Sequence, residues 1–247
     1  MDIFRFTDYQ LGNIIGSGTF GKVYVISNAD ETKSYAAKIF KSNIQYDFHQ
    51  LRREVEILSK LNHPAILQFI TFGQHNFKKK IKPVLVTELA QKKTLRDIIN
   101  DERLSLASEQ WTLTQKLIVL YGIASAMAFL HENRIIHRDL KPDNILMDEN
   151  FNPKVADFGL SKVLHQNEDS ISMQSMSGVK GTPMYMSPEA LTKGEYTKEG
   201  DVYSFAMIAY QIMTSERLLN DKNIVTFSDR IQKGERPQFS VPIPDPF

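Results

Sequence analysis

The chain has 247 residues, of which 42% are apolar, enough to bury the core of one large domain or of two small ones. Thirty basic residues against twenty-nine acidic ones leave a formal charge of +1, so the overall balance does not indicate nucleic acid or an acidic membrane surface as a partner. Because cysteine is absent, disulfides and thiolate metal sites are excluded, and a reducing compartment is expected, with the cytoplasm as the default.

The first ninety residues have the pattern of short strands. Segments rich in β-branched and aromatic residues, separated by Gly, Asn, Asp or Lys turns, occur at 9–15, 23–27, 34–40, 65–72 and 83–88. One helix interrupts them, because apolar residues recur at helical spacing over 48–61. The N-terminal twelve residues lack a basic segment followed by an apolar run, so we expect no secretory signal.

Helical patterns dominate from Leu95 onward. They cover 95–100, 113–132 and 201–214, with short strand-like segments at 145–147 and 154–156. The longest apolar stretch, 117–130, is shorter than the roughly eighteen residues that a membrane span needs, so we expect a buried helix there and no membrane span. The change of pattern predicts an α+β protein, with a small β-rich lobe at 1–86, a hinge at 87–92 and a helical lobe at 93–247.

A glycine-rich turn lies between the first two predicted strands, as Gly16-Ser17-Gly18-Thr19-Phe20-Gly21-Lys22-Val23. Because glycine has no Cβ, Gly16, Gly18 and Gly21 allow backbone N–H groups to approach phosphate oxygens closely. A dinucleotide-binding fold would require a helix directly after the glycines, and a strand follows instead. The context therefore favours a flap over a nucleotide.

Lys38 lies within the third predicted strand. Alternation places Ala36, Lys38 and Phe40 on one face of the sheet. A cation on the side of the glycine turn would neutralise nucleotide phosphates if an acidic partner held it, and Glu54 on the helix at 48–61 is the candidate. The alternatives are a lysine that faces solvent and an exposed glutamate on the helix.

Three later motifs are His137-Arg138-Asp139-Leu140-Lys141-Pro142-Asp143-Asn144, Asp157-Phe158-Gly159 and Ser187-Pro188-Glu189. They resemble the catalytic loop, the metal-binding triplet and the closing triplet of eukaryotic protein kinases. They follow the glycine turn, the strand lysine and the helix glutamate in the order typical of that family. The resemblance extends from about Leu11 to Asp201 and implies the two-lobed kinase fold in a single domain over 1–247.

The resemblance gives each polar residue a role in phosphoryl transfer from ATP. Asp139 would accept the proton of the acceptor hydroxyl, and Lys141 would stabilise charge on the transferring group. Asn144 and Asp157 would supply oxygen ligands to Mg²⁺ ions that bridge the phosphates. The implied catalytic set is Lys38, Glu54, Asp139, Lys141 and Asn144.

An adenine pocket is also implied by the resemblance. Thr87 would lie at the back of this pocket, and the backbone of Glu88 and Ala90 would bond to the edge of the base. Apolar side chains would cover the two faces of the base, namely those of Ile15, Val23, Ala36 and Leu146.

The acceptor is expected to be a serine or threonine of a protein substrate. Lys141-Pro142 and Thr182 are similar to serine/threonine kinases, in which that threonine bonds near the catalytic aspartate and shapes a shallow acceptor site. The residues at 186–189 and 201–206 resemble the tyrosine-kinase-like group of these enzymes. The expected partners are therefore ATP and such a protein, with no nucleic acid.

A polar stretch before the closing triplet is rich in serine, with Ser170, Ser172, Ser175 and Ser177. We expect that one of them is phosphorylated and that its charge pairs with Arg138, which would order this loop. The alternative is a flexible loop that happens to be rich in serine.

The chain ends at Phe247, before the last helices of the family pattern, so we expect a fragment or a shortened protein. One of those helices bears an arginine that pairs with the residue corresponding to Glu189, which would here lack that partner at a cost of about a few kcal/mol if buried. This leaves open an alternative function, a kinase-like ATP-binding scaffold or regulatory module with weak or no turnover. A small-molecule phosphotransferase is a third possibility, for which the segments at 181–183 and 187–189 would not be expected.

Overall fold

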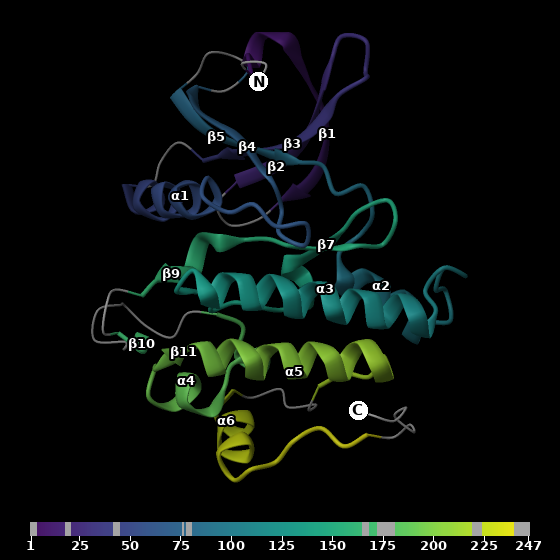
Figure 1. The fold of residues 1–247 in the computed structure, drawn as a ribbon, viewed down its shortest axis with the longest axis vertical. Helices are drawn as coiled ribbons and strands as arrows, with labels where there is room; N and C mark the ends of the chain where they lie inside the picture. The colour runs from purple at the N-terminus through teal and green to yellow at the C-terminus, as the bar shows by residue number, and fades with distance from the viewer. Residues whose placement is uncertain are drawn as a thin grey trace.

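The structure is a computed structural model with two lobes, a sheet with one helix above and a group of helices below (Figure 1). It describes residues 4–17, 21–41, 45–75, 77, 81–164, 168–171, 181–218 and 224–239. The α+β architecture predicted from the two sequence patterns is confirmed, with the β-rich half first along the chain.

The upper lobe is a five-stranded antiparallel sheet in the order β1-β2-β3-β5-β4. Its strands are β1 (Tyr9–Ser17), β2 (Gly21–Asn28), β3 (Ser34–Phe40), β4 (Phe69–His75) and β5 (Ile81–Glu88). The strand predicted at 65–72 begins only at Phe69. Its first residues bond to the other lobe instead, since Val155 donates to the Ala65 carbonyl oxygen (2.8 Å) and Leu67 donates to that of Val155 (2.9 Å).

Helix α1 (Gln45–Leu58) packs beside this sheet (Figure 1). It begins and ends three residues earlier than the apolar spacing predicts. Its buried face carries Leu51, Ile57 and Leu58, which join the main hydrophobic core. Glu54 lies on the same buried face and is only 4% exposed, so a carboxylate enters the core between the two lobes.

The lower lobe is helical. Its helices are α2 (Leu95–Arg103), α3 (Leu113–Glu132), α4 (Pro188–Thr192), α5 (Lys198–Thr214) and α6 (Ile224–Gln232). Threonine side chains cap three of them, because Thr94, Thr112 and Thr197 accept a backbone N–H from the first turn of α2, α3 and α5. These caps explain why the starts of α2 and α3 agree with the sequence pattern.

Helices α3 and α5 lie side by side and form the centre of the lower lobe (Figure 1). By length and composition alone, α3 is long and apolar enough to cross a membrane, and it is longer than the apolar stretch expected from the sequence. In this fold, Val119, Ile123, Ala126 and Leu130 of α3 are fully buried. The prediction of a buried core helix is therefore confirmed for this face of α3.

In the described part of the chain, three pairs of short strands lie outside the five-stranded sheet, and two of these pairs flank the sequence motifs at 137–144 and 157–159. The pairs are β6 (Ile135–Ile136) with β9 (Lys162–Val163), β7 (Ile145–Met147) with β8 (Pro153–Val155), and β10 (Ser170–Ile171) with β11 (Tyr196–Thr197). Single 3-10 turns, at Phe6–Asp8, Pro142–Asn144, Phe158–Leu160 and Pro183–Tyr185, complete the described elements. Two of these turns directly follow Lys141 and Asp157, so the motif residues lie at the starts of tight turns.

Candidate active site

Lys38 on β3 and Glu54 on α1 form an ion pair. The Lys38 Nζ donates to Oε1 and Oε2 of Glu54 at 3.1 and 3.2 Å, and the lysine side chain is only 23% exposed. Burial raises the pKa of Glu54 above its usual value, although the positive charge of Lys38 acts in the opposite direction. The two alternatives, a solvent-facing lysine and an exposed glutamate, are therefore excluded.

Asp157 lies close enough to this pair for its charge to raise the pKa of Glu54 further. Its neighbour Ala156 donates a backbone hydrogen bond to the Asn144 carbonyl oxygen (2.8 Å). Asn144 in turn donates its side-chain N–H to the backbone oxygen (2.8 Å) and to Oδ2 (3.1 Å) of Asp139. Residues far apart in the sequence are thus linked into one site between the lobes.

The backbone at Asp157 is left-handed, with φ 63° and ψ 71°, which is uncommon for a residue with a side chain. The next residue, Phe158, is fully buried, and its ring meets the ring of buried His137 edge-on at 5.2 Å. Burial of Phe158 near α1 holds the strained turn in place and leaves the Asp157 carboxylate exposed. His137 is a core histidine, with Nε2 at 3.1 Å from the Ala156 carbonyl oxygen.

The Asp139 carboxylate is surrounded by donors. Its Oδ1 accepts hydrogen bonds from the backbone N–H (2.9 Å) and hydroxyl (3.0 Å) of Thr182. Its Oδ2 accepts from the Asn144 side chain and forms an ion pair with Lys141 Nζ (2.8 Å). Lys141 also donates to the Thr182 hydroxyl (2.7 Å), so Lys141, Thr182 and Asp139 form one connected group. The structure thus places Thr182 against the predicted catalytic aspartate.

Gly181 allows Thr182 to reach Asp139. Its φ is 122°, in the region that favours glycine, and a Cβ there would lie 3.0 Å from the backbone oxygen of Arg138. Any other residue at this position would strain the backbone and push it away from the catalytic loop.

Asp201 on α5 anchors the catalytic loop, a role that the sequence interpretation did not assign. It is 2% exposed and accepts backbone N–H bonds from His137 and Arg138, both at 2.9 Å, while His131 Nε2 lies 2.9 Å from its Oδ2. An acidic residue in the first turn of an apolar helix is the only sequence signal, and it does not identify partners more than sixty residues away.

The strand register brings the predicted nucleotide-binding residues of the upper lobe together. Val23 pairs with both Gly16 and Lys38, and Ala36 pairs with Thr87. The apolar residues expected to cover the base are not in the core: Ile15 is 51% exposed, and Val23, Ala36 and Leu146 are half-buried.

Of the glycines in the turn between β1 and β2, Gly18 lies outside the described residues. Gly21 has a further role, because a Cβ there would clash with the Ile39 carbonyl oxygen on β3.

The side chains of Thr87 and Glu88, at the start of the hinge, form hydrogen bonds and an ion pair that fix their positions. Thr87 is buried and donates its hydroxyl to the Glu88 carbonyl oxygen (3.1 Å). The Glu88 carboxylate accepts from the Gln68 backbone N–H (2.8 Å) and forms an ion pair with Lys154 Nζ (3.0 Å). This arrangement fixes the strand end that leads to Ala90, whose backbone is predicted to meet the base.

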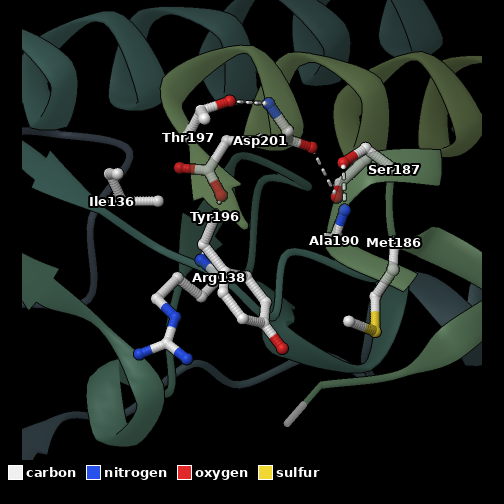
Figure 2. A pocket seen from close by; sticks show the side chains of 10 residues that line it. Ile136, Arg138, Met186, Ser187, Ala190, Tyr196, Thr197 and Asp201 are labelled. Carbon is white, nitrogen blue, oxygen red and sulfur yellow. Dashed lines mark hydrogen bonds between the residues drawn. The ribbon is translucent and has the colours of Figure 1, made fainter. Parts of the chain in front are cut away.

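Arg138 is buried beneath the segment that leads to α4. Its side chain lies next to Tyr196 (Figure 2), with the guanidinium 4.2 Å from the ring centre. Its Nη1 donates to the Leu160 carbonyl oxygen (3.3 Å). The two residues border a cavity of about 10 Å³. Of the four predicted regulatory serines, Ser170 lies on β10 opposite Thr197, whereas the other three, Ser172, Ser175 and Ser177, lie outside the described residues.

Glu189 is half-buried, so the cost expected for a fully buried carboxylate without its arginine does not apply in full. Burial raises the pKa of nearby Tyr203, the charge of Arg236 lowers it, and the charge of Glu189 raises it. The Arg236 guanidinium lies 5.3 Å from the Tyr203 ring centre. Arg236 is therefore the arginine that lies next to Tyr203, the residue whose pKa the Glu189 charge raises.

Comparison with known proteins agrees with this geometry. The family model described as "Protein kinase domain" matches residues 9–244. "Serine/threonine-protein kinase fused" of Drosophila melanogaster is 32% identical over 210 residues, 84% of this chain and 24% of that protein. "Probable serine/threonine-protein kinase gdt2" of Dictyostelium discoideum is 33% identical over 252 residues, 98% of this chain and 14% of that protein.

"Dual specificity protein kinase shkC", also of Dictyostelium discoideum, is 33% identical over 238 residues, 94% of this chain and 44% of that protein. The chain spans less than half the length of each of these three relatives. The match covers both lobes and all the motif residues described above. The chain therefore belongs to the protein kinase domain family.

Proposed function

We propose that the chain is an ATP-dependent protein kinase that phosphorylates serine or threonine. The observation that carries the proposal is the convergence of the Lys38–Glu54 pair with Asp157, Asn144 and Asp139 at one site between the lobes. Phosphoryl transfer needs charge neutralisation on the phosphates and an oriented acceptor hydroxyl, and these residues supply both.

The oxygen donors at the site fit Mg²⁺. The exposed Asp157 carboxylate accepts no hydrogen bond within the described residues, and Asn144 uses its N–H donors on Asp139, which leaves its amide oxygen available. The described part of the chain has no cluster of three acidic or histidine side chains able to hold a metal by itself. Asp157 and Asn144 would therefore hold Mg²⁺ together with the phosphates of ATP, and the ion would neutralise phosphate charge.

Asp139 would receive the proton of the acceptor hydroxyl. As the hydroxyl oxygen bonds to the γ-phosphorus, the bond between that phosphorus and the bridging oxygen breaks, and ADP leaves. Among the described residues, three donors hydrogen-bond to the Asp139 carboxylate, which has about four acceptor positions, and Lys141 Nζ forms an ion pair with Oδ2 at 2.8 Å. A substrate hydroxyl would use the remaining acceptor position, next to the Thr182 hydroxyl.

Two alternatives to a serine/threonine kinase remain, namely phosphorylation of tyrosine and a scaffold without turnover. The name of the dual-specificity relative makes tyrosine a second candidate acceptor, whereas the contact of Thr182 with Asp139 favours a short acceptor. The scaffold alternative predicts nucleotide binding without turnover, and the complete polar set at the site argues against it. Location in the cytoplasm stays a prediction.

Transfer of label from γ-labelled ATP to a generic basic protein tests the proposal, with phosphoamino-acid analysis of the product. We expect labelled serine or threonine with the wild type, loss of at least about a hundredfold in rate for Asp139→Asn, and no change for Glu149→Gln, an exposed control. Equal labelling by wild type and Asp139→Asn would refute the proposal, and nucleotide binding without any labelling would favour the scaffold. Labelled tyrosine would favour the dual-specificity reading.

A further inference from the structure

A cavity of about 420 Å³ lies beside the catalytic loop. Helix α2 and the residues after α5 provide two of its walls, and the turn at Pro183–Tyr185 with the preceding Thr182 provides another. Its polar and charged lining includes Arg96, Arg103, Thr182, Tyr185, Gln211 and Arg217. Because Thr182 also bonds to Asp139, the cavity begins directly next to the place where the acceptor hydroxyl would lie.

The charge of the lining is entirely positive. Among the described residues that line the cavity there are three arginines and no acidic side chain. Arg96 forms a two-point ion pair with Asp143 of the catalytic loop, which neutralises its charge. Arg103 donates only to a neutral oxygen, that of the Asn100 side chain (2.8 Å), and the exposed Arg217 has no hydrogen-bond or ion-pair partner in the part of the chain that the structure describes.

Acidic residues next to the cavity wall in the sequence are already bonded elsewhere. Asp101 pairs with Lys93 (2.8 Å), and Glu102 pairs with Lys116 (2.6 Å). Glu216, next to Arg217, accepts the hydroxyl of Tyr210 (2.6 Å). These acids are therefore not available to compensate Arg103 and Arg217.

The remaining polar groups of the lining are neutral. Burial raises the pKa of Tyr185 to about 12, so its hydroxyl stays protonated and donates to Gln211 (2.7 Å). The cavity therefore offers two guanidinium groups without a charged partner, neutral hydrogen-bonding groups and an apolar wall.

We propose that this cavity binds an anionic side chain of the protein substrate, a few residues from the serine or threonine that is phosphorylated. This rests on the proposed kinase function and specifies the class of substrate. Guanidinium groups bond carboxylates and phosphates through paired N–H donors, whereas a lysine or arginine of the substrate would meet like charge. An extended peptide advances about 3.3 Å per residue, so only positions near the acceptor can reach Arg103 and Arg217.

A set of fluorescent peptides with one central serine tests the inference. Glutamate, phosphoserine, alanine or lysine is placed at each of the five positions before and after that serine. Binding is measured by anisotropy with the wild type and with Asp139→Asn, and turnover is measured with the wild type.

At one or more positions we expect glutamate or phosphoserine to strengthen binding about tenfold over lysine, with a smaller difference at high salt. A gain with glutamate identifies carboxylate residues as the natural ligand, and a gain with phosphoserine alone identifies a substrate phosphorylated beforehand.

Variants then locate the effect. Arg103→Gln with Arg217→Gln should reduce the preference for glutamate or phosphoserine over lysine to within about twofold. Arg217→Glu should favour lysine at the same position. Arg52→Gln, the same change at an exposed arginine of α1, is the matched control and should keep the preference.

The inference is wrong if lysine binds as well as glutamate and phosphoserine at every position, or if the Arg103→Gln/Arg217→Gln variant keeps the full preference. Turnover without any preference would leave the kinase proposal standing and remove only the anionic subsite. The anionic preference in binding without any turnover would support the subsite and contradict the kinase proposal.

Discussion

The guanidinium of Arg96 on α2 bonds to both carboxylate oxygens of Asp143 in the catalytic loop. This pair joins the first helix of the lower lobe to the turn at Pro142–Asn144, and Asn144 of that turn bonds to Asp139. Helix α2 therefore helps to position the aspartate on which the proposed chemistry depends.

Replacing Arg96 by lysine should affect activity more than stability. Both side chains of the pair are about two-fifths exposed, so we expect the free energy of unfolding to fall by no more than about 1 kcal/mol. Lysine keeps the charge and loses the two-point geometry, so the turnover number should fall while the KM for ATP stays unchanged. Denaturant unfolding and steady-state kinetics measure the two effects, and a change confined to the KM for ATP would contradict this reading.

Stability should depend on pH through Glu54. Burial raises its pKa in the folded state above that in the unfolded chain. This contribution favours folding below the unfolded-state pKa and is lost as pH rises through the folded-state pKa. Glu54→Gln, which has no ionisable group, should therefore lose less stability than the wild type when pH rises from 5 to 8.

Unfolding of both proteins in denaturant at several pH values checks this difference. The exposed Glu56→Gln, two residues away on α1, is the matched control and should follow the wild type. Parallel curves for wild type and Glu54→Gln would show that Glu54 does not titrate differently in the two states.

Gly181→Ala should reduce activity through the backbone alone. Alanine is strained at φ 122° and would press on the Arg138 carbonyl oxygen, which displaces Thr182 from Asp139. We expect a loss of about 1 kcal/mol in the free energy of unfolding and a large fall in turnover. Gly234→Ala is the control, because Gly234 also has a positive φ (86°) but a Cβ there meets nothing within 4 Å. That variant should lose similar stability and keep its turnover, and equal turnover in both would contradict the prediction.

Local patterns predicted the elements that local interactions determine. The third strand, Ser34–Phe40, and helix α3, Leu113–Glu132, have the predicted bounds, because alternation defines the first and a threonine cap with a long apolar run defines the second. The segment at 65–68 was wrongly predicted as strand, since Ala65 and Leu67 bond to Val155 of the other lobe. Helix α4, with five residues, is too short to show a period in the sequence, and α6, although as long as α2, was not predicted.

The motif residues of the candidate site could be found from their order along the chain, because the family resemblance includes that order. The positions of Asp201 and of the arginine-lined cavity could not. Asp201 acts through backbone N–H groups of residues 137 and 138, which any sequence has. Arg103 and Arg217 are more than one hundred residues apart in the sequence and line the same cavity only because the fold brings α2 and the end of α5 to it.

The hairpin of β7 and β8 connects the two lobes through main-chain bonds. Besides the bonds of Val155 to residues 65–67, its Met147 carbonyl oxygen accepts the Lys92 N–H of the hinge (3.0 Å). Both connections meet one hairpin, so a rotation of one lobe against the other would have its axis near this hairpin. Strand β4 lies at the sheet edge next to this axis, and β1 lies at the opposite edge, roughly 19 Å away at about 4.8 Å per strand spacing. A rotation of roughly ten degrees would therefore move the β1 edge of the sheet by roughly 3 Å. The displacement would be largest at the edge that carries the glycine-rich turn, where the phosphates are expected to bind.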